Sequence, residues 1–177
     1  MNEYRIEVDF AKARSAAFAL KIGWENYMHT ASDKIRTCQS QMRKTAIDAI
    51  CRAGYADDSV YDSLEKSYIN NFVSIEPDFE EINKTLNALA AINTNKSVKL
   101  LFVFLHGLHK KKCSGKWGEK EKIIFPWVVN NLGHTKIKCK NIWNLLVVIY
   151  RTEKYTKEER IYARNTLLKI KKANSAL

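Results

Sequence analysis

Apolar residues recur every three or four positions along most of this sequence, which is the spacing of a helix with one buried face. The first series predicts a helix that begins near Asp9, whose carboxylate can cap the amides of the first turn. Its members are Phe10, Ala13, Ala17, Leu20, Trp24 and Met28. A second series predicts a helix that ends at Gly54, and its members are Ile35, Cys38, Met42, Ala46, Ala49 and Ala53. We expect the two helices to form an antiparallel hairpin.

Two shorter helices are expected in the rest of the first half. The earlier one has Asp58 or Ser59 as its N-terminal cap. Its apolar series is Tyr61, Leu64, Tyr68 and Phe72. The later one starts at Pro77, whose fixed φ suits a first helical turn. Its apolar series is Phe79, Ile82, Leu86, Leu89 and Ile92, and the pattern stops at residues 93–95.

The second half of the chain opens with its most apolar run, residues 100–105. This run predicts a nearly buried helix over residues 96–111. Residues 111–122 hold two glycines and several lysines, so they are expected to form an exposed loop. The next stretch, residues 123–129, contains Pro126. It is compatible either with a short extended segment or with the start of a new helix.

Two more helices are expected at the end of the chain. The first is indicated by the series Trp143, Leu146, Val147 and Tyr150. The last begins at Thr156, because a threonine followed three residues later by Glu159 can form a capping box. The sequence therefore predicts an all-α fold, a compact bundle of about seven to eight helices. Six glycines and two prolines would supply too few turns for an all-β fold.

Charge is distributed unevenly along the 177 residues, whose formal net charge is +11. Residues 1–90 carry 11 basic and 14 acidic residues, whereas residues 91–177 carry 19 basic and 5 acidic ones. We expect an acidic-to-neutral helical layer, 1–93, and a basic helical half, 94–177, within one continuous globular domain. A surface of one sign commonly serves a polyanionic partner.

The basic half predicts a surface that binds phosphate. On the last helix Lys157, Arg160, Arg164 and Lys171 fall within an arc of about 60°. Trp117 lies among the loop lysines and offers a stacking surface to an unpaired base. We expect a protein that binds RNA or DNA through the phosphate backbone without catalysis, for example as a small subunit of a nucleoprotein complex. The residues expected to bind are Lys111, Lys112, Lys116, Trp117, Lys136, Lys138, Arg160, Arg164 and Lys171.

Two other interpretations use the same cations. A small regulatory or inhibitory factor, of phage or host origin, would bind an acidic surface of a target protein. Alternatively, long cationic side chains cover apolar neighbours on a solvated helix face and have no partner. The spacing of the lysines does not choose among these interpretations. It also does not separate RNA from DNA, or single strands from double strands.

Histidine and cysteine form two spaced pairs in the basic half. His109 and Cys113 are four positions apart, His134 and Cys139 are five apart, and twenty residues lie between the pairs. Zinc takes four such ligands in a tetrahedron, so the pairs could close the lysine-rich loop around a structural zinc ion. The alternatives are free side chains, or a reactive Cys113 activated by the lysines at 110–112. No other cofactor is expected.

The sequence lacks clear signatures of catalysis and of membrane insertion. The basic half has no cluster of carboxylates for a metal-dependent nuclease, and no glycine loop that would cradle a phosphate. The remaining enzymatic option uses His106 or His109 as a general base. No apolar run approaches the roughly 20 residues that span a bilayer, and the four cysteines form no CxxC pair. We expect a soluble, cytoplasmic protein without a membrane partner, or a nuclear one in a eukaryote.

Overall fold

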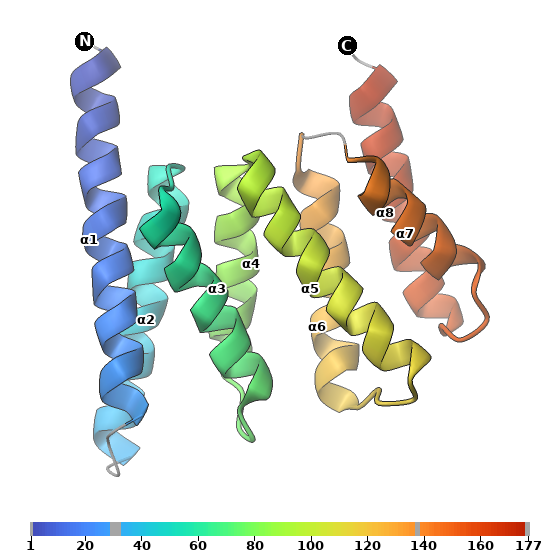
Figure 1. Ribbon diagram of the computed structural model, residues 1–177, viewed down its shortest axis with the longest axis horizontal. Helices are drawn as coiled ribbons and strands as arrows, with labels where there is room; N and C mark the ends of the chain where they lie inside the picture. The colour runs from blue at the N-terminus through green and yellow to red at the C-terminus, as the bar shows by residue number, and fades with distance from the viewer. Residues whose placement is uncertain (1, 29–32, 137–138, 176–177) are drawn as a thin grey trace. The chain divides into compact units, whose positions relative to one another are not determined.

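The computed structural model describes residues 2–28, 33–136 and 139–175, with the side chains of residues 9–26, 37–136 and 139–173 (Figure 1). These residues form eight α-helices and no strand, which confirms the predicted all-α fold. In chain order the helices are α1 (Asn2–Met28), α2 (Asp33–Ala53), α3 (Asp58–Val73), α4 (Phe79–Ile92), α5 (Asn95–Cys113), α6 (Glu119–His134), α7 (Lys140–Arg151) and α8 (Lys157–Ser175).

The helices belong to two compact units, Met1–Ile92 and Asn93–Leu177, which we call unit 1 and unit 2. Unit 1 contains α1 to α4, and unit 2 contains α5 to α8. The charge balance of the sequence changes sign at this boundary. Unit 1 carries 11 basic and 14 acidic residues, and unit 2 carries 19 and 5. Each unit therefore has its own electrostatic character.

The first two helices of unit 1 form the expected antiparallel hairpin (Figure 1). Gly54 follows α2 with a φ of +66°, a left-handed conformation that glycine adopts without steric cost. The predicted start of α1 at Asp9 is wrong, because the helix already begins at Asn2 and Asp9 lies inside it. The predicted buried face of α1 is correct in its described part, which consists mainly of Ala13, Ala17, Leu20 and Trp24.

The buried face of α2 differs from the predicted one. Cys38 and Met42 are exposed. The buried positions are Gln39, Arg43, Ala46, Ile47 and Ile50. Arg43 is tolerated there because its Nε lies 3.0 and 3.2 Å from the two carboxylate oxygens of Glu81 on α4. Burying either charge alone would be strongly unfavourable, so the two residues must be buried as a pair. A series of apolar residues does not reveal such a pair, because neither member is apolar.

A buried polar network around this pair joins the four helices of unit 1. The side chains of Arg43 and Glu81 are 2% and 0% exposed. Ser67 on α3 donates a hydrogen bond to Glu81 Oε1 at 2.7 Å, and Arg43 Nη1 donates to the Gly23 carbonyl oxygen of α1 at 3.4 Å. A Cβ atom at Gly23 would lie 2.7 Å from Arg43 Cγ, so glycine is needed where the arginine crosses α1. The network thereby fixes how the helices pack.

The starts of α3 and α4 differ from those expected. Asp57 caps α3, so the predicted caps Asp58 and Ser59 lie inside the helix. Asp78 accepts a hydrogen bond from an amide of the first turn of α4, so Pro77 precedes the helix instead of opening it. The apolar series of α4 is confirmed at four positions that are buried: Ile82, Leu86, Leu89 and Ile92.

In unit 2, α5 is longer and less buried than predicted. Val103 and Gly107 are exposed, so the helix has a solvent-facing side. It continues to Cys113, and α6 begins at Glu119, so the loop is limited to residues 114–118 instead of 111–122. Lysines in the last turn are compatible with the helix because cations interact favourably with the C-terminal end of its dipole.

Residues 123–129 are helical, so the extended alternative is wrong. They lie within α6, and Pro126 occupies the interior of that helix. Its ring crowds the carbonyl of Lys122, at a cost of roughly 3 kcal/mol. Full burial of an apolar side chain contributes roughly 1.5–3 kcal/mol, so five of them outweigh this cost. The five buried at helical spacing are Ile124, Phe125, Val128, Val129 and Leu132.

The prediction for α7 is partly wrong, whereas the predicted capping box of α8 is confirmed. Trp143 and Tyr150 on α7 are exposed, so the predicted apolar series is wrong there. The buried residues of α7 are Ile142, Leu146 and Ile149. The capping box of α8 is confirmed: the Thr156 amide donates to the Glu159 carboxylate at 2.8 Å, and the Glu159 amide donates to the Thr156 hydroxyl at 3.3 Å.

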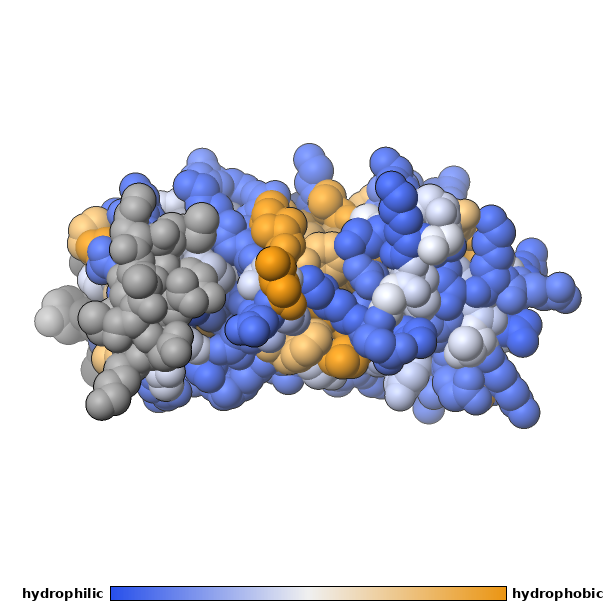
Figure 2. Space-filling model, turned by 90° about the horizontal axis from the view of Figure 1, so that it is seen from below, coloured by the Kyte–Doolittle hydropathy of each residue, from blue (hydrophilic) through white to orange (hydrophobic). Residues whose placement is uncertain are grey.

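The end of α3 and the turn that follows it carry exposed apolar side chains. Val73 and Ile75 are 72% and 97% exposed. Figure 2 views the molecule from the side on which this turn lies, and apolar residues gather there among hydrophilic ones. Among the helices that the structure describes, none has both the length and the apolar character needed to cross a membrane.

Candidate functional site

Glu159, in the first turn of α8, is the centre of a polar cluster in unit 2. Its carboxylate accepts hydrogen bonds from Lys112 Nζ on α5 at 2.9 and 3.1 Å, and from Trp117 Nε1 in the loop after α5 at 3.0 Å. It also accepts the Thr156 amide of the capping box. One carboxylate thus ties the end of α5, the α5–α6 loop and the start of α8 together, and Glu159 is buried as a result.

Tyr155 lies beside this carboxylate and is only 2% exposed. Its ring packs against Phe125 and Trp117, with ring centroids 5.5 and 6.2 Å apart. Its hydroxyl is hydrogen-bonded to His109 Nδ1 at 2.8 Å, and the two rings are nearly parallel. Burial raises the pKa of Tyr155, and Cys113 and Glu159 add to that increase. The hydroxyl is therefore a fixed, neutral partner for the imidazole.

His109 also contacts Cys113, which lies one helical turn further along α5. The Cys113 Sγ atom is 3.6 Å from His109 Nε2 and 3.9 Å from Nδ1. Burial lowers the pKa of His109, and His106 and Lys154 act in the same direction. The Cys113 side chain is exposed. The end of α5 therefore presents a thiol to solvent, next to an imidazole that burial keeps neutral near pH 7.

A second carboxylate holds the start of α6. Glu121 accepts a hydrogen bond from Lys111 Nζ at 2.7 Å and another from the Gly118 amide at 3.0 Å. Burial alone would raise the pKa of Glu121, but the hydrogen bonds from Lys111 and Gly118 lower it below the ordinary value. Lys111 and Lys112 therefore both form ion pairs with carboxylates of their own unit, and these ion pairs hold the α5–α6 corner in place.

The end of unit 2 around Cys113 carries a group of exposed cations. Lys154 Nζ, in the turn between α7 and α8, lies 3.4 Å from the Cys113 carbonyl oxygen and so brings that turn against the end of α5. In Figure 1 the α5–α6 loop and the α7–α8 turn lie toward the same end of this unit. We call this group the basic end, and its members are Lys110, Lys116, Lys154 and Lys157.

The other residues expected to bind phosphate have different surroundings. Arg164 and Lys171 are exposed on α8, and Arg160 is half-buried there. Lys136 is exposed after α6, and its amide donates to the Asn93 side chain at 2.9 Å. Lys138 lies outside the described residues. Trp117 is half-buried, with Lys112 Nζ 4.5 Å from its ring centroid, so part of its surface is already covered.

The four residues considered as zinc ligands do not assemble. Only His109 and Cys113 are in contact. His134 lies in the last turn of α6, and Cys139 precedes α7. Within the part of the chain that the structure describes, no group of three or more histidine, cysteine or acidic side chains is arranged to hold a metal ion. The regular spacing in the sequence is therefore not matched by proximity in the fold.

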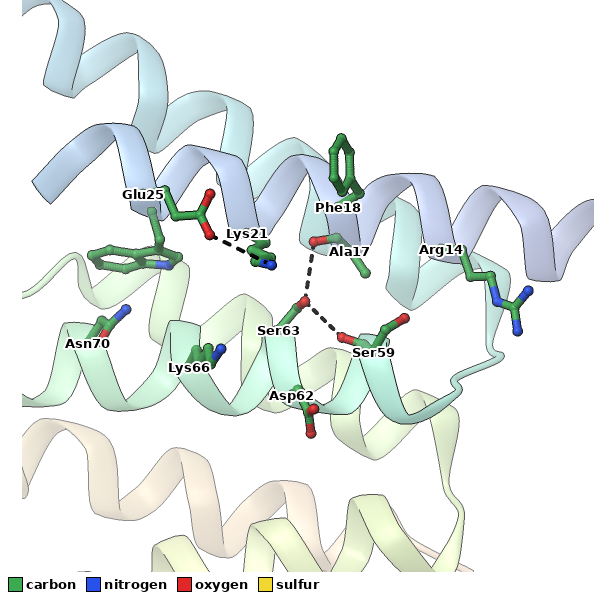
Figure 3. Close-up of a pocket in the computed structure, with 11 residues that line it drawn as sticks. Arg14, Ala17, Phe18, Lys21, Glu25, Ser59, Asp62, Ser63, Lys66 and Asn70 are labelled. Carbon is green, nitrogen blue, oxygen red and sulfur yellow. Dashed lines mark hydrogen bonds and ion pairs between the residues drawn. The ribbon is translucent and has the colours of Figure 1, made fainter. Parts of the chain in front are cut away.

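Unit 1 contains a pocket of 530 Å³ between α1 and α3 (Figure 3). Ala17 and Ser63 lie in it, and the Ser63 hydroxyl donates to the Ala17 carbonyl oxygen at 3.3 Å. Lys21 and Glu25 form an ion pair of 3.8 Å along α1. The charged residues of the lining are Arg14, Lys21, Lys66, Glu25 and Asp62. Because both signs are represented, the pocket does not share the polarity of unit 2.

Sequence reasoning missed the roles of Tyr155 and Glu159. The capping box identifies Glu159 as a helix cap. It gives no sign that the same carboxylate also binds Lys112, which lies 47 positions earlier. The sequence likewise gives no sign that Tyr155 is buried and faces His109. These roles depend on contacts distant in sequence, which local periodicity does not encode.

Comparison of the chain with protein-family models, with curated proteins and with solved structures finds no match.

Proposed function

We propose that unit 2 binds nucleic acid through the phosphate backbone and without catalysis. The observation that supports this proposal is the charge balance of the unit, which has 19 basic residues and only 5 acidic ones. If each carboxylate neutralised one cation, a surplus of 14 positive charges would still remain. Such a surplus attracts a polyanion, and the counterions that the polyanion releases contribute to binding.

The basic end is the part of unit 2 that we assign to the phosphates. Lys110, Lys116, Lys154 and Lys157 are exposed, and they belong to the end of α5, the loop after it, the turn between α7 and α8 and the start of α8. Arg164 and Lys171 extend the positive surface along α8. Lys111, Lys112 and Trp117 are assigned to the internal carboxylate contacts instead, because using them for phosphate would leave Glu121 and Glu159 without their partners.

The test is nucleic-acid binding by a variant in which the four lysines of the basic end are replaced by glutamine. Its matched control replaces four exposed cations of unit 1 in the same way: Lys12, Lys21, Arg52 and Lys66. Both variants lose the same net charge. Fluorescence anisotropy with single- and double-stranded RNA and DNA, over a salt series, measures the affinity. We expect the slope of log K against log salt to fall by about 0.7–0.9 for each lost phosphate contact in the first variant only.

Two results would contradict the proposal. One is no binding of any of these four nucleic acids by the unaltered protein at low salt. The other is an equal loss in both variants, because the bulk charge and not the basic end would then control the affinity. The alternative partner, an acidic protein surface, would be favoured if polyglutamate bound through the basic end while nucleic acid did not.

A further inference from the structure

We propose that Cys113 is a site of reversible thiol–disulfide exchange with small anionic disulfides, in which His109 takes the thiol proton and Tyr155 positions the imidazole. This inference does not rest on nucleic-acid binding. It rests on three side chains in contact: the exposed Cys113 Sγ, 3.6 Å from His109 Nε2, and the Tyr155 hydroxyl, 2.8 Å from His109 Nδ1.

The order of the three groups is that of an activated nucleophile, since a base lies beside the thiol and a third group orients the base. The reaction uses the tautomer in which His109 Nδ1 carries the ring proton. In this tautomer the Nδ1–H group donates a hydrogen bond to the Tyr155 hydroxyl oxygen. His109 Nε2 then has its lone pair available for the thiol proton. Tyr155 can hold this arrangement because it is buried, and its ring is packed against Phe125 and Trp117.

The surroundings of Cys113 determine which disulfides it should prefer. Lys154 reaches the Cys113 carbonyl oxygen, and Lys110 and Lys116 are exposed three residues to either side in the sequence. These cations attract a disulfide that carries carboxylates, repel one that carries ammonium groups and leave a neutral one unaffected. The chemical class of reagent is therefore a small acidic peptide disulfide, for which oxidised glutathione is a suitable probe.

The exchange is balanced without any further oxidant. His109 Nε2 accepts the proton of Cys113, and the resulting thiolate attacks one sulfur of the reagent. A bond forms between that sulfur and Cys113 Sγ while the disulfide bond of the reagent breaks. The released thiolate takes the proton back from His109. One reagent disulfide has become one mixed disulfide on the protein and one free thiol, and an added thiol reverses the reaction.

Cys38 provides a matched control within the same chain, because it is also an exposed, free cysteine. One variant keeps only Cys113 and another keeps only Cys38, with the remaining cysteines replaced by serine. Intact-mass spectrometry follows their reaction with oxidised glutathione, with neutral hydroxyethyl disulfide and with cationic cystamine. We expect Cys113 to react about tenfold faster than Cys38 with oxidised glutathione. We also expect the rate at Cys113 to be highest with the anionic reagent, lower with the neutral one and lowest with the cationic one.

Further variants separate the base from the electrostatic attraction. His109→Gln should slow the reaction of Cys113 with all three reagents by about tenfold and keep their order. Replacing Lys110, Lys116 and Lys154 by glutamine should slow the reaction with oxidised glutathione most, so that the rate order of the three reagents is lost. Tyr155→Phe keeps the buried ring and removes only the hydroxyl, so it should slow all three reactions by about threefold.

Several outcomes would overturn the inference. Equal rates at Cys113 and Cys38, or the same rate order at both, would remove the special role of this thiol. An unchanged rate in His109→Gln would exclude the histidine as the base, and an unchanged rate in Tyr155→Phe would exclude the positioning role. If the single-cysteine variants do not fold, peptide mapping of the unaltered protein after partial reaction compares the same two cysteines directly.

Discussion

The two units use their charged residues in opposite ways. In unit 1, cations and carboxylates of different helices pair with one another, and one pair is completely buried. Among the side chains that the structure describes, such pairs include Arg14–Asp57, Arg43–Glu81, Lys44–Asp78, Lys44–Glu80 and Lys84–Asp48. In unit 2, Glu121 and Glu159 hold the α5–α6 corner and the start of α8, and the 19 basic residues of the unit outnumber its 5 acidic ones.

This difference shows how charged residues can specify packing in one region and remain in surplus in another. Nearly balanced charges, as in unit 1, can satisfy each other and specify which helices meet. A surplus of one sign, as in unit 2, repels itself and is stabilised by a counter-charge from outside. Removing one carboxylate at a time tests this comparison.

The largest effect is expected from Glu81→Gln in unit 1. The change leaves the Arg43 guanidinium buried without its counter-charge, which should lower the free energy of unfolding by roughly 3–5 kcal/mol. The Ser67 hydroxyl keeps an acceptor in the amide oxygen, so the loss reports mainly on the ion pair. Urea unfolding followed by circular dichroism measures the effect.

Glu80→Gln is the matched control, because Glu80 is the adjacent residue and its side chain is 62% exposed. Its ion pairs with Lys44 and Lys84 are close to solvent, and exposed pairs contribute less than about 1 kcal/mol. Equal losses in the two variants would contradict the view that the buried pair fixes the packing of unit 1.

An intermediate effect is expected from Glu159→Gln in unit 2. The variant leaves Lys112 largely buried without a carboxylate and weakens the hydrogen bond to Trp117, so the free energy of unfolding should fall by roughly 2 kcal/mol. It also removes one of the few negative charges of unit 2, so the affinity for nucleic acid should rise. Thermal unfolding and anisotropy measure the two effects on the same sample.

Glu153→Gln removes the same charge from an exposed position in the turn after α7. We expect the same direction of change in affinity but a change in stability within about 0.5 kcal/mol. A similar loss of stability in both variants would show that the contacts of Glu159 are not what holds the start of α8.

The smallest effect is expected from Asp57→Ala, which removes the cap of α3 and the ion pair with Arg14. The free energy of unfolding should fall by about 1 kcal/mol at neutral pH. Burial opposes ionisation of Asp57, but hydrogen bonds from Ser59, Arg14 and the Val60 amide lower its pKa to about 2. As the pH falls, Asp57 therefore binds a proton at a higher pH in the unfolded chain than in the folded protein. The stabilisation by its charge is present above the ordinary pKa of 3.8 and disappears as the pH falls toward 2.

A titration of stability against pH checks this expectation. The difference between the unaltered protein and Asp57→Ala should be constant near neutrality and should shrink between about pH 4 and pH 2. Asp62→Ala, at an exposed position on the same helix, serves as the control. A difference that does not change with pH would mean that the carboxylate of Asp57 does not stabilise the fold through its charge.

How far the sequence predicts the fold is best seen by comparing α4 with α2. The buried face of α4 contains Glu81 and Thr85, but its apolar members Ile82, Leu86, Leu89 and Ile92 are at helical spacing and still give the correct orientation. The buried face of α2 contains Gln39 and Arg43, and Met42 is exposed, so the same reasoning is correct at Ala46 but misplaces part of the buried face. Helix existence depends on local spacing, whereas the orientation of a helix also depends on a distant partner such as Glu81.

The candidate site was predictable in part for the same reason. The surplus of cations in the second half is a property of composition and can be read directly from the sequence. Which of those cations are available cannot be read in this way, because it depends on where five carboxylates fall in space. Lys112 and Lys116 look equivalent in the sequence, yet one is bonded to Glu159 and the other is exposed.

The contact between Lys112 and Glu159 has a consequence for the order in which the protein is made. Synthesis from the N-terminus completes α1 to α4 early, so unit 1 has all its own helices while unit 2 is still emerging from the ribosome. Tyr155 and Glu159 leave the ribosome after almost all the other residues they contact. Until then the end of α5 has neither its aromatic cover nor its counter-charge, so the nascent chain should be most vulnerable to aggregation and proteases just before α8 is released.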